Sequence, residues 1–391
     1  MSEIVIAGAK RTAIGSFLGQ FTGVPTPKLG AIAIRAALEQ SGIAPADVSE
    51  VIMGCVLPAN LGQAPARQAS LEAGLPVSAG CTTINKVCGS GMKALMLAHD
   101  LIKVGSAKVV VAGGMESMTN APHMVNARTG IRYGDGQLVD HMAWDGLTNP
   151  YDGQSMGVFG EKCADKYTFT REEQDAYAIA SVERAQAAQK ANAFNNEIVP
   201  VTVQGRKGPQ DFAEDEQPGR SDTAKIPTLR AAFRKENGTI TAASSSSISD
   251  GAAALVLLDA DDAKARGVTA LARIVAHATH SQEPEWFTTA PVGAISKVLE
   301  KAGWKADDVD LFEINEAFAV VPMAVMRELG VPHDKVNVNG GACALGHPIG
   351  ASGARIVVTL LNALTARGAK RGVAALCIGG GEATAIAIEL V

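Results

Sequence analysis

The sequence predicts an α/β protein built from two similar halves, each with a largely parallel sheet covered by helices. Strand-like and helix-like segments alternate along the chain, which is typical of parallel sheets. Residues 36–54 and 297–315 share Leu, Glu, Gly, Asp and Val at equivalent positions, which indicates an internal repeat. The 47% hydrophobic residues include only 4% aromatic ones, so Ala, Val, Ile and Leu must fill the core. Such residues suit helices packed on a buried sheet.

The repeat extends over three successive units. Each copy of the first unit predicts a helix ending at a glycine, a short polar connection and a buried strand. Residues 82–105 and 335–368 then predict a strand, a turn and a helix, with a longer turn in the second copy. Residues 108–117 and 372–383 each predict a strand that breaks at glycines. The helix after Cys88 is apolar nearly all round, so we expect it to be buried between the two sheets, giving five layers, α-β-α-β-α.

Residues 119–245 interrupt this pattern. They contain a polar, basic stretch and an amphipathic helix that begins with the capping box Thr170 to Glu173. An insertion of this size between strands is usually a functional lid or binding loop. We therefore expect three parts, with residues 1–118 plus 246–269 as the first half, 119–245 as the loop domain and 270–391 as the second half.

Charge and cysteine usage exclude several classes of protein. The formal charge of −5 argues against a general nucleic-acid surface. No run approaches 18 uncharged apolar residues and no secretory pattern is present, so neither a membrane span nor export is expected. The six cysteines form no Cys-x-x-Cys pair, and no His/Cys cluster has zinc spacing. Reduced thiols in a cytoplasmic protein are the simplest interpretation.

Cys88 is the first candidate for chemistry. It lies at a predicted strand-to-helix turn, where free N–H groups and the helix dipole stabilise a thiolate and offer donors to an oxyanion. Its position alone leaves open the alternative of a small buried packing thiol. Residues 89–94, GSGMKA, also match the dinucleotide fingerprint, but Gly113 and Gly114 stand where an acidic residue would hold the ribose. The glycines would instead clear space for a ligand at the helix N-terminus.

Three further polar residues follow strands or turns of the second half. His347 lies in the turn equivalent to that of Cys88, where its imidazole could act as a general base. Asn315 and Cys377 end two predicted strands of this half. Because ligand sites of parallel sheets lie at the carboxyl ends of the strands, we expect these three residues and Cys88 to meet.

The motifs resemble those of the thiolase family, and within it the bacterial acetyl-CoA acetyltransferases. The matching stretches cover the whole chain: RTAIGSF, GQAPARQA, NKVCGSGMKA, VAGGMESM, NEAFA, NVNGGACALGHPIGASGAR and LCIGGGEA. The resemblance implies two duplicated βαβαβαββ halves in five layers, with an inserted loop domain that binds coenzyme A. It also implies a homodimer or homotetramer.

The resemblance further implies reversible Claisen condensation of two acetyl-CoA to acetoacetyl-CoA and free CoA. No cofactor or metal is implied, since the CoA thioesters are substrates. Cys88 would be the acetylated nucleophile, His347 would take its proton, and Cys377 would remove the α-proton of the second acetyl group. One oxyanion hole would combine His347 with a water held by Asn315. The other would use the N–H groups of Cys88 and Gly379.

The same resemblance implies a set of residues that contact the substrate. Those expected around the pantetheine or acyl group, or near the nucleotide phosphates, are Leu147, Ser155, Met156, Arg220, Ser246, Phe287, Ala317 and Phe318. Arg206, Lys207 and Lys225 are further candidates for the phosphates.

Two positions depart from the family pattern and put the acyl-chain preference in doubt. Ser155 replaces a common His, and Phe287 replaces a common Met. A broader 3-ketoacyl-CoA thiolase of fatty-acid degradation therefore remains an alternative. A non-catalytic acyl-CoA-binding relative and an NAD(P)-dependent oxidoreductase are more distant ones.

Overall fold

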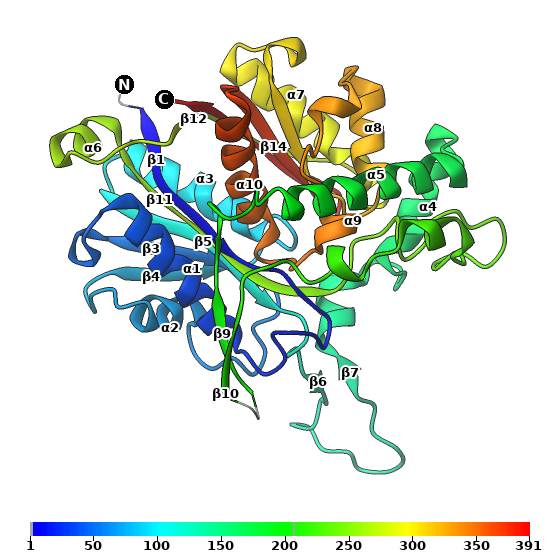
Figure 1. The fold of residues 1–391 in the computed structure, drawn as a ribbon. Coiled ribbons are helices and arrows are strands. Elements are labelled where there is room, and N and C mark those ends of the chain that lie inside the picture. The colour runs from blue at the N-terminus through cyan, green and yellow to red at the C-terminus, as the bar shows by residue number, and fades with distance from the viewer. Residues whose placement is uncertain (1–2, 206–207) are drawn as a thin grey trace.

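The computed structural model describes residues 3–205 and 208–391 (Figure 1). Arg206 and Lys207, which were expected near phosphates, lie outside the described residues. None of the helices within these two ranges combines the length and the apolar character that a membrane span requires.

The first half forms a mixed sheet with the strand order β4-β3-β5-β11-β1. Its strands are β1 (Ile4–Thr12), β3 (Glu50–Gly54), β4 (Gly80–Ile84), β5 (Val109–Ser117) and β11 (Ser249–Asp259). β3 runs parallel to both β4 and β5, whereas β11 is antiparallel to β5 and to β1. The carboxyl ends of β3, β4 and β5 therefore face the same edge, and the chain continues from β4 toward Cys88 there.

The second half repeats this arrangement with the strand order β12-β15-β14-β13. Its strands are β12 (Ala272–Ser281), β13 (Leu311–Ile314), β14 (Arg371–Ile378) and β15 (Glu382–Leu390). β13 and β14 are parallel, and the other neighbours are antiparallel. β12 also pairs with β1 at the positions opposite Ile4 to Ile6, so the two halves are joined along a short seam.

The strand predicted at the start of residues 335–368 is reduced to one bridge between Phe312 and Val336. Asn337 accounts for this difference, because its φ of 49° takes the backbone into the left-handed region. The side-chain amide of Asn337 then makes the hydrogen bonds to Ile314 that the backbone of a strand would make. It accepts from the Ile314 nitrogen and donates to the Ile314 oxygen, both at 2.8 Å.

Helices cover the outer face of each half. α1 (Thr26–Ser41) and α2 (Pro65–Glu72) pack on the first sheet through one hydrophobic cluster. α7 (Ala290–Ala302) and α8 (Val320–Leu329) pack on the second sheet through another. Figure 1 shows these two pairs on opposite sides of the molecule.

Two helices occupy the centre, α3 (Ser90–Lys103) and α10 (Ser352–Arg367). A single hydrophobic cluster contains residues of both helices and of strands from both halves. The order of layers is therefore helix, sheet, helix, sheet, helix, and the prediction of five layers with α3 between the sheets is confirmed. The two central helices bring the turns that precede them, with Cys88 and His347, to the same region.

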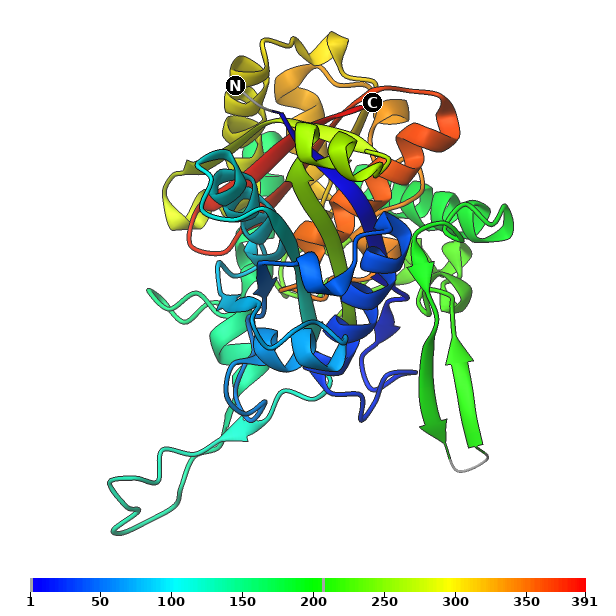
Figure 2. The same ribbon diagram turned by 90° about the vertical axis from the view of Figure 1, so that its left-hand side faces the viewer.

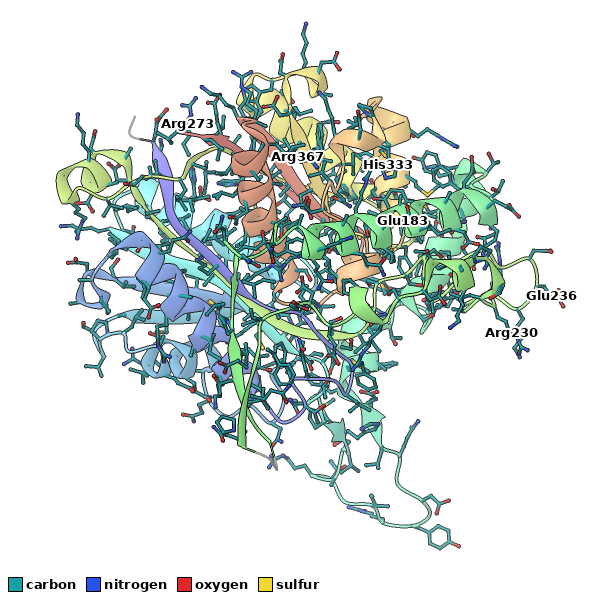
Figure 3. The ribbon with its side chains drawn as sticks, viewed as in Figure 1. Glu183, Arg230, Glu236, Arg273, His333 and Arg367 are labelled. Atoms are coloured by element: carbon teal, nitrogen blue, oxygen red, sulfur yellow. The ribbon has the colours of Figure 1, made fainter. Side chains whose placement is uncertain are left out.

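The insertion between β5 and β11 contributes two helices and two arms. α4 (Met156–Tyr167) precedes α5 (Arg171–Lys190), which begins with the predicted capping box of Thr170 and Glu173. One arm pairs β6 (His123–Met124) with β7 (Val139–Asp140), and the other pairs β9 (Val201–Gly205) with β10 (Gly208–Phe212). Both arms extend away from the layers (Figure 2). A charged loop that includes Arg230 and Glu236 projects from the side of the insertion (Figure 3).

A buried ion cluster ties the insertion to the first half. Arg11 on β1 donates from Nε to Glu197 at 2.6 Å and from both terminal nitrogens to Asp215 at 2.7 and 2.9 Å. The side chains of Arg11 and Glu197 are fully buried, and Asp215 is 2% exposed. Glu197 and Asp215 precede and follow the β9–β10 arm, so one guanidinium holds both ends of that arm.

Candidate active site

Cys88 lies in a tight turn between β4 and α3. Val87, just before it, has a φ of 47°, which is unusual for a β-branched residue and stores strain. The turn is closed by Ser90, whose hydroxyl accepts from the Lys86 nitrogen at 2.8 Å and donates to the Val87 oxygen at 2.6 Å. The local hydrogen bonds therefore fix the thiol at the start of the central helix.

The Cys88 thiol is protonated at neutral pH in this structure. Burial raises its pKa to about 11, although the N–H groups of Gly379 and of Cys88 itself favour the thiolate. A thiolate stabilised by the helix N-terminus was expected, but the cost of desolvating the charge outweighs those donors. The two N–H groups remain directed at the sulfur, where they can serve a developing oxyanion. The nucleophile consequently needs a base.

His347 follows α9 (Ala342–Leu345) in the turn before α10, and it is 4% exposed. Burial and the positive charge of Arg355 lower its pKa to about 3, so the imidazole is neutral. Its Nδ1 lies 2.6 Å from Ser352 Oγ, which also lies 2.9 Å from the Pro348 oxygen. When the hydroxyl donates to Pro348, Nδ1–H donates to the hydroxyl and Nε2 is left as a base. When the hydroxyl turns to Nδ1, Nε2 carries the proton and becomes a donor.

Asn315 follows β13 and is fully buried beside His347. Its Nδ2 lies 3.5 Å from His347 Nε2. Its Oδ1 is buried and meets no hydrogen-bond donor among residues 3–205 and 208–391. A buried acceptor without a partner costs free energy, so this atom is available to a water or a ligand group. The position agrees with the expected water-holding role.

Cys377 lies near the end of β14 and is 1% exposed. Burial and the nearby charge of Cys88 raise its pKa well above the ordinary value. Gly380 and Gly381 follow with φ values of 94° and 91°, which turn the chain sharply into β15. The structure therefore brings the second thiol close to the first.

The two turns that carry Cys88 and His347 are packed directly on each other. A Cβ on Gly91 would lie 2.8 Å from the Ala354 nitrogen, and one on Gly353 would lie 2.4 Å from the Met92 nitrogen. The glycines after Cys88 were expected to make room for a ligand. Gly91 instead allows α3 and α10 to meet at their first turns, which places the thiol and the imidazole in one region, and Gly89 makes room for the side chain of Ile378.

Two buried carboxylates that sequence reasoning missed support these turns. Glu116 accepts from the nitrogens of Val56, Leu57 and Gly350 at 2.8–3.2 Å, and burial raises its pKa to about 7. Glu316, next to Asn315, accepts from the hydroxyls of two residues of α5, from one side chain before α9 and from one backbone nitrogen within α9. Those donors are Tyr177, Ser181, Asn337 and Cys343. The repeat of Gly-Gly-x-Glu at the ends of β5 and β14 was the available signal for Glu116.

A cavity of about 350 Å³ lies beside the Cys88 turn. Its lining residues come from that turn, the insertion and the glycine turn after β14: Val87, Trp144, Asp145, Gly146, Thr148, Pro150, Tyr151, Met156, Gly379 and Gly380. Met156 and Gly379 belong to the predicted set. The exposed aromatic residues Trp144 and Tyr151 were not singled out from the sequence. The cavity thus lies between the insertion and the turn that carries Cys88.

Four other predicted contact residues lie around this region. Leu147 packs against the same small hydrophobic cluster as Cys88. Ser246 donates from its nitrogen and its hydroxyl to the Ala317 oxygen, at 3.0 and 3.2 Å. The Phe318 ring meets Phe233 edge-to-face. The end of the insertion is therefore bound to the turn after Asn315.

The remaining three predicted contacts have different surroundings. Ser155 is exposed immediately before α4. Phe287 is 3% exposed, meets Phe159 edge-to-face at 6.3 Å and belongs to the same hydrophobic cluster as Cys377. Arg220 does not line the cavity, and its guanidinium pairs with Glu216 on the surface.

A half-buried thiol with two N–H donors directed at it and a second thiol beside it can carry an acyl group as a thioester and pass it on. The fold and the site define an acyltransferase.

Two family models match this chain almost from end to end. The thiolase N-terminal domain matches residues 4–261, and the thiolase C-terminal domain matches residues 268–390. The chain belongs to the thiolase family, which confirms the resemblance stated from the motifs. The oxidoreductase alternative is not supported.

Known relatives are similar to this chain in sequence over nearly their full length. The chain is 52% identical to acetyl-CoA acetyltransferase 2 of Arabidopsis thaliana, covering 99% of this chain and 97% of the relative. It is 52% identical to an acetyl-CoA acetyltransferase of Chromobacterium violaceum, covering 99% of each. The crystal structure of a thiolase from Ascaris suum in complex with coenzyme A superposes with a TM-score of 0.95, at 44% identity and with full coverage of both chains. The predicted thiolase-like fold is confirmed.

Proposed function

We propose that this protein is an acetyl-CoA C-acetyltransferase that interconverts two acetyl-CoA with acetoacetyl-CoA and free CoA. The observation that carries the proposal is that the Cys88 and Cys377 thiols lie close to each other, with the Gly379 N–H directed at Cys88. The names and full-length similarity of the relatives support the substrate class. The direct test is to measure acetyl-CoA formed from acetoacetyl-CoA and CoA by the purified chain. Lack of this thiolysis, in protein that is folded, would contradict the proposal.

In the first half-reaction Cys88 acquires the acetyl group. His347, neutral and with Nε2 free, accepts the Cys88 proton while the sulfur attacks the carbonyl of acetyl-CoA. The N–H groups of Cys88 and Gly379 stabilise the oxyanion. The new bond is from Cys88 sulfur to the acetyl carbon, and the bond to the CoA sulfur breaks. The departing CoA thiolate takes the Cys377 proton, so Cys377 becomes a thiolate while His347 keeps the Cys88 proton on Nε2.

In the second half-reaction Cys377 acts as the base. It removes an α-proton from a second acetyl-CoA, and the enolate oxygen is stabilised by His347 Nε2–H and the group held by Asn315. The enolate carbon attacks the acetyl group on Cys88. The carbon–sulfur bond to Cys88 then breaks, giving acetoacetyl-CoA. His347 returns its proton to the Cys88 sulfur and Cys377 retains the α-proton, so all three groups regain their starting protonation states. No cofactor or redox partner enters either step.

Ser352 is a positioning residue in this scheme, because its hydroxyl selects the tautomer of His347. Replacing Ser352 by alanine leaves Nδ1 without its partner in a buried site. We expect kcat to fall about 10-fold to 100-fold, corresponding to about 1–3 kcal/mol for an unsatisfied buried group. Steady-state assays of Ser352→Ala and Ser352→Thr test this, with threonine restoring most of the rate.

Ser296→Ala is the matched control for Ser352→Ala. The Ser296 hydroxyl on α7 likewise donates to the carbonyl four residues earlier, at 2.8 Å, but meets no imidazole. The kcat of the Ser296→Ala enzyme should equal that of the unsubstituted protein. A Ser352→Ala enzyme whose kcat stays within twofold of the parent would rule out the tautomer role. An altered pH profile of kcat in Ser352→Ala alone distinguishes positioning from a loss of fold.

Phe287 supports a preference for short acyl chains. Its buried ring packs on Phe159 within the cluster that contains Cys377, so it takes up volume beside the base. We expect Phe287→Leu to raise kcat/KM for six-carbon 3-ketoacyl-CoA relative to acetoacetyl-CoA by about tenfold, the value of one or two methylenes in an apolar pocket. Chain-length profiles of both proteins measure this ratio.

Phe212→Leu provides a control for the smaller side chain. Phe212 also meets another ring edge-to-face, that of Phe21, but it lies on the β10 arm. Its substitution should leave the profile unchanged. Strong activity of the unsubstituted chain on six-carbon and longer substrates would instead favour the broader 3-ketoacyl-CoA thiolase of fatty-acid degradation.

Assembly and location belong to the same proposal. β4 is an edge strand with half-buried residues, and the arm around Tyr133 exposes apolar side chains, so both surfaces suit a second copy of the chain. We propose a homodimer or homotetramer, which the mass in solution tests. We propose a cytoplasmic location. One relative, from Bos taurus, is mitochondrial by name, and imaging of the tagged chain distinguishes the two compartments.

A further inference from the structure

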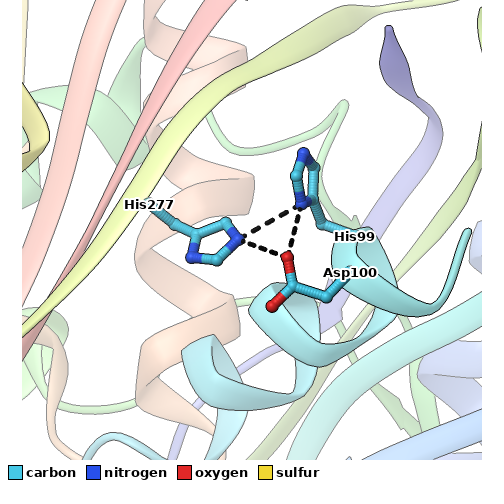
Figure 4. A group of neighbouring side chains, drawn as sticks. All are labelled: His99, Asp100 and His277. Carbon is cyan, nitrogen blue, oxygen red and sulfur yellow. Dashed lines mark hydrogen bonds and ion pairs between the residues drawn. The ribbon is translucent and has the colours of Figure 1, made fainter. Parts of the chain in front are cut away.

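Three potential metal ligands converge at a place remote from the active site. His99 and Asp100 lie on α3, eleven and twelve residues after Cys88, and His277 lies on β12. His277 Nε2 is 3.2 Å from His99 Nδ1 and 2.9 Å from Asp100 Oδ1, and the latter two atoms are 3.0 Å apart. Figure 4 shows the two rings and the carboxylate directed at a common point. No local spacing in the sequence announces this cluster.

No arrangement of protons gives a favourable hydrogen bond at all three contacts of this triangle. Each imidazole nitrogen offers either one proton or one lone pair. If both nitrogens are protonated, two N–H groups face each other. If either is not, its lone pair faces the Asp100 oxygen. The Asp100 side chain is 53% exposed, so its carboxylate is ionised at neutral pH. One of the three contacts is therefore always repulsive.

A divalent cation would remove that repulsion, because it accepts all three lone pairs together. In a tetrahedral zinc site with bonds of about 2.0–2.1 Å, ligand atoms lie roughly 3.3–3.4 Å apart. The observed triangle needs to open by less than about 0.5 Å to reach this geometry. The two rings are nearly perpendicular, at 83°, so they do not block each other.

The surroundings fit a site with one open coordination position. The side chain of Asp100 is 53% exposed, whereas those of His99 and His277 are 16% and 15% exposed. An ion can therefore enter past the carboxylate and keep a water. Lys301 opposes binding through its charge, but its ammonium donates to the His277 carbonyl oxygen at 3.0 Å.

We propose that His99, Asp100 and His277 form a binding site for one divalent transition-metal ion of the zinc type. The site joins the C-terminal part of α3 to the first strand of the second half. Two histidines and one carboxylate are the ligand set that zinc and cobalt accept, with water in the fourth position. The site is separate from the thiols and takes no part in acyl transfer.

Co²⁺ is the probe for this site, since its visible absorption reports coordination number. The active-site thiols also bind such ions, so the titration uses the full chain with Cys88→Ser and Cys377→Ser. We expect one equivalent of Co²⁺ to give the visible bands of a four- or five-coordinate ion. The near-ultraviolet band of thiolate ligation should be absent, and Zn²⁺ should displace the Co²⁺.

Substitutions in the same background decide which residues bind. We expect His277→Ala and the more exposed His99→Gln each to weaken Co²⁺ binding at least tenfold, and Asp100→Asn to weaken it as well. His280→Ala is the matched control, because His280 lies on the same strand but outside the cluster, 3.1 Å from Gln282 Oε1. It should bind like the parent.

Two results would overturn the proposal. One is a parent that gives no saturable Co²⁺ spectrum, in which case the triangle is a hydrogen-bonded contact only. The other is binding that survives both His277→Ala and His99→Gln, which would place the ion elsewhere. Circular dichroism of each variant confirms that it is folded before titration.

Discussion

Replacing Cys88 by alanine is expected to abolish acetyl transfer and to lower kcat for condensation and thiolysis by about 10⁴-fold or more. The reason is that the acetyl group then has no sulfur to which it can be bound. Cys377→Ala should behave differently, because it removes the base for the second half-reaction but leaves Cys88 and its oxyanion donors in place. Condensation should fall about 10²-fold to 10⁴-fold, while Cys88 still becomes acetylated.

Mass spectrometry after incubation with acetyl-CoA separates the two roles. We expect one acetyl group on Cys88 in the Cys377→Ala protein and none in the Cys88→Ala protein. Cys81→Ala is the matched control, since this half-buried thiol lies on β4 and contacts Arg67. It should retain both label and rate. An acetyl group found on Cys377 would reverse the assignment of nucleophile and base.

Removing Arg11 is expected to cause the largest loss of stability. Arg11→Met leaves the buried carboxylates of Glu197 and Asp215 without their cation, and breaking a buried ion pair in this way costs about 3–5 kcal/mol. The loss should be seen as a lower urea midpoint. Burial already raises the pKa of Glu197, with Arg11 opposing the shift. Without Arg11 the raised pKa should rise further, so the deficit should be largest at pH 7–8 and shrink as the carboxylates are protonated at lower pH.

Two comparisons make this test specific. Lys10→Met is the matched control, because Lys10 is the neighbour of Arg11 and donates to the Asn196 oxygen at 2.5 Å from a partly exposed position. It should cost less than about 1 kcal/mol. Adding Glu197→Gln and Asp215→Asn to Arg11→Met should recover most of the loss. No recovery would mean that packing, rather than uncompensated charge, holds the arm.

Much of the fold could be predicted from the sequence because the internal repeat contains the same helix and strand units in both halves. Helix ends at glycines, the all-round apolar helix after Cys88 and the capping box of Thr170 are local features, and each is where it was expected. The strand predicted at the start of residues 335–368 is reduced to a single bridge, and its apolar pattern gave no sign of this. The side chain of Asn337 takes over the pairing with Ile314, a choice that depends on a contact made after folding.

The site was predictable as far as strand ends and turns define it. Position placed Cys88, His347, Cys377 and Asn315 together, because equivalent turns must meet when the halves stack. The pKa of Cys88 was not predictable, since local donors were visible in the sequence and the amount of burial was not. Contacts between distant segments, such as Glu116 with the Gly350 nitrogen, leave no spacing that a single sequence reveals.

The connection that leaves the last parallel strand differs greatly between the halves. Residues 118–248 join β5 to β11, whereas Gly379–Gly381 alone join β14 to β15. A scaffold with approximate twofold symmetry would otherwise present two equal openings, one for each half. In this protein the long connection of the first half covers one opening. The three-glycine connection of the second half leaves the other opening uncovered beside the thiols. In the proposed mechanism the two halves have different tasks, because the first half supplies the nucleophile and the wall of the entrance. The other supplies the proton-transfer groups, so a single pocket serves a doubled framework.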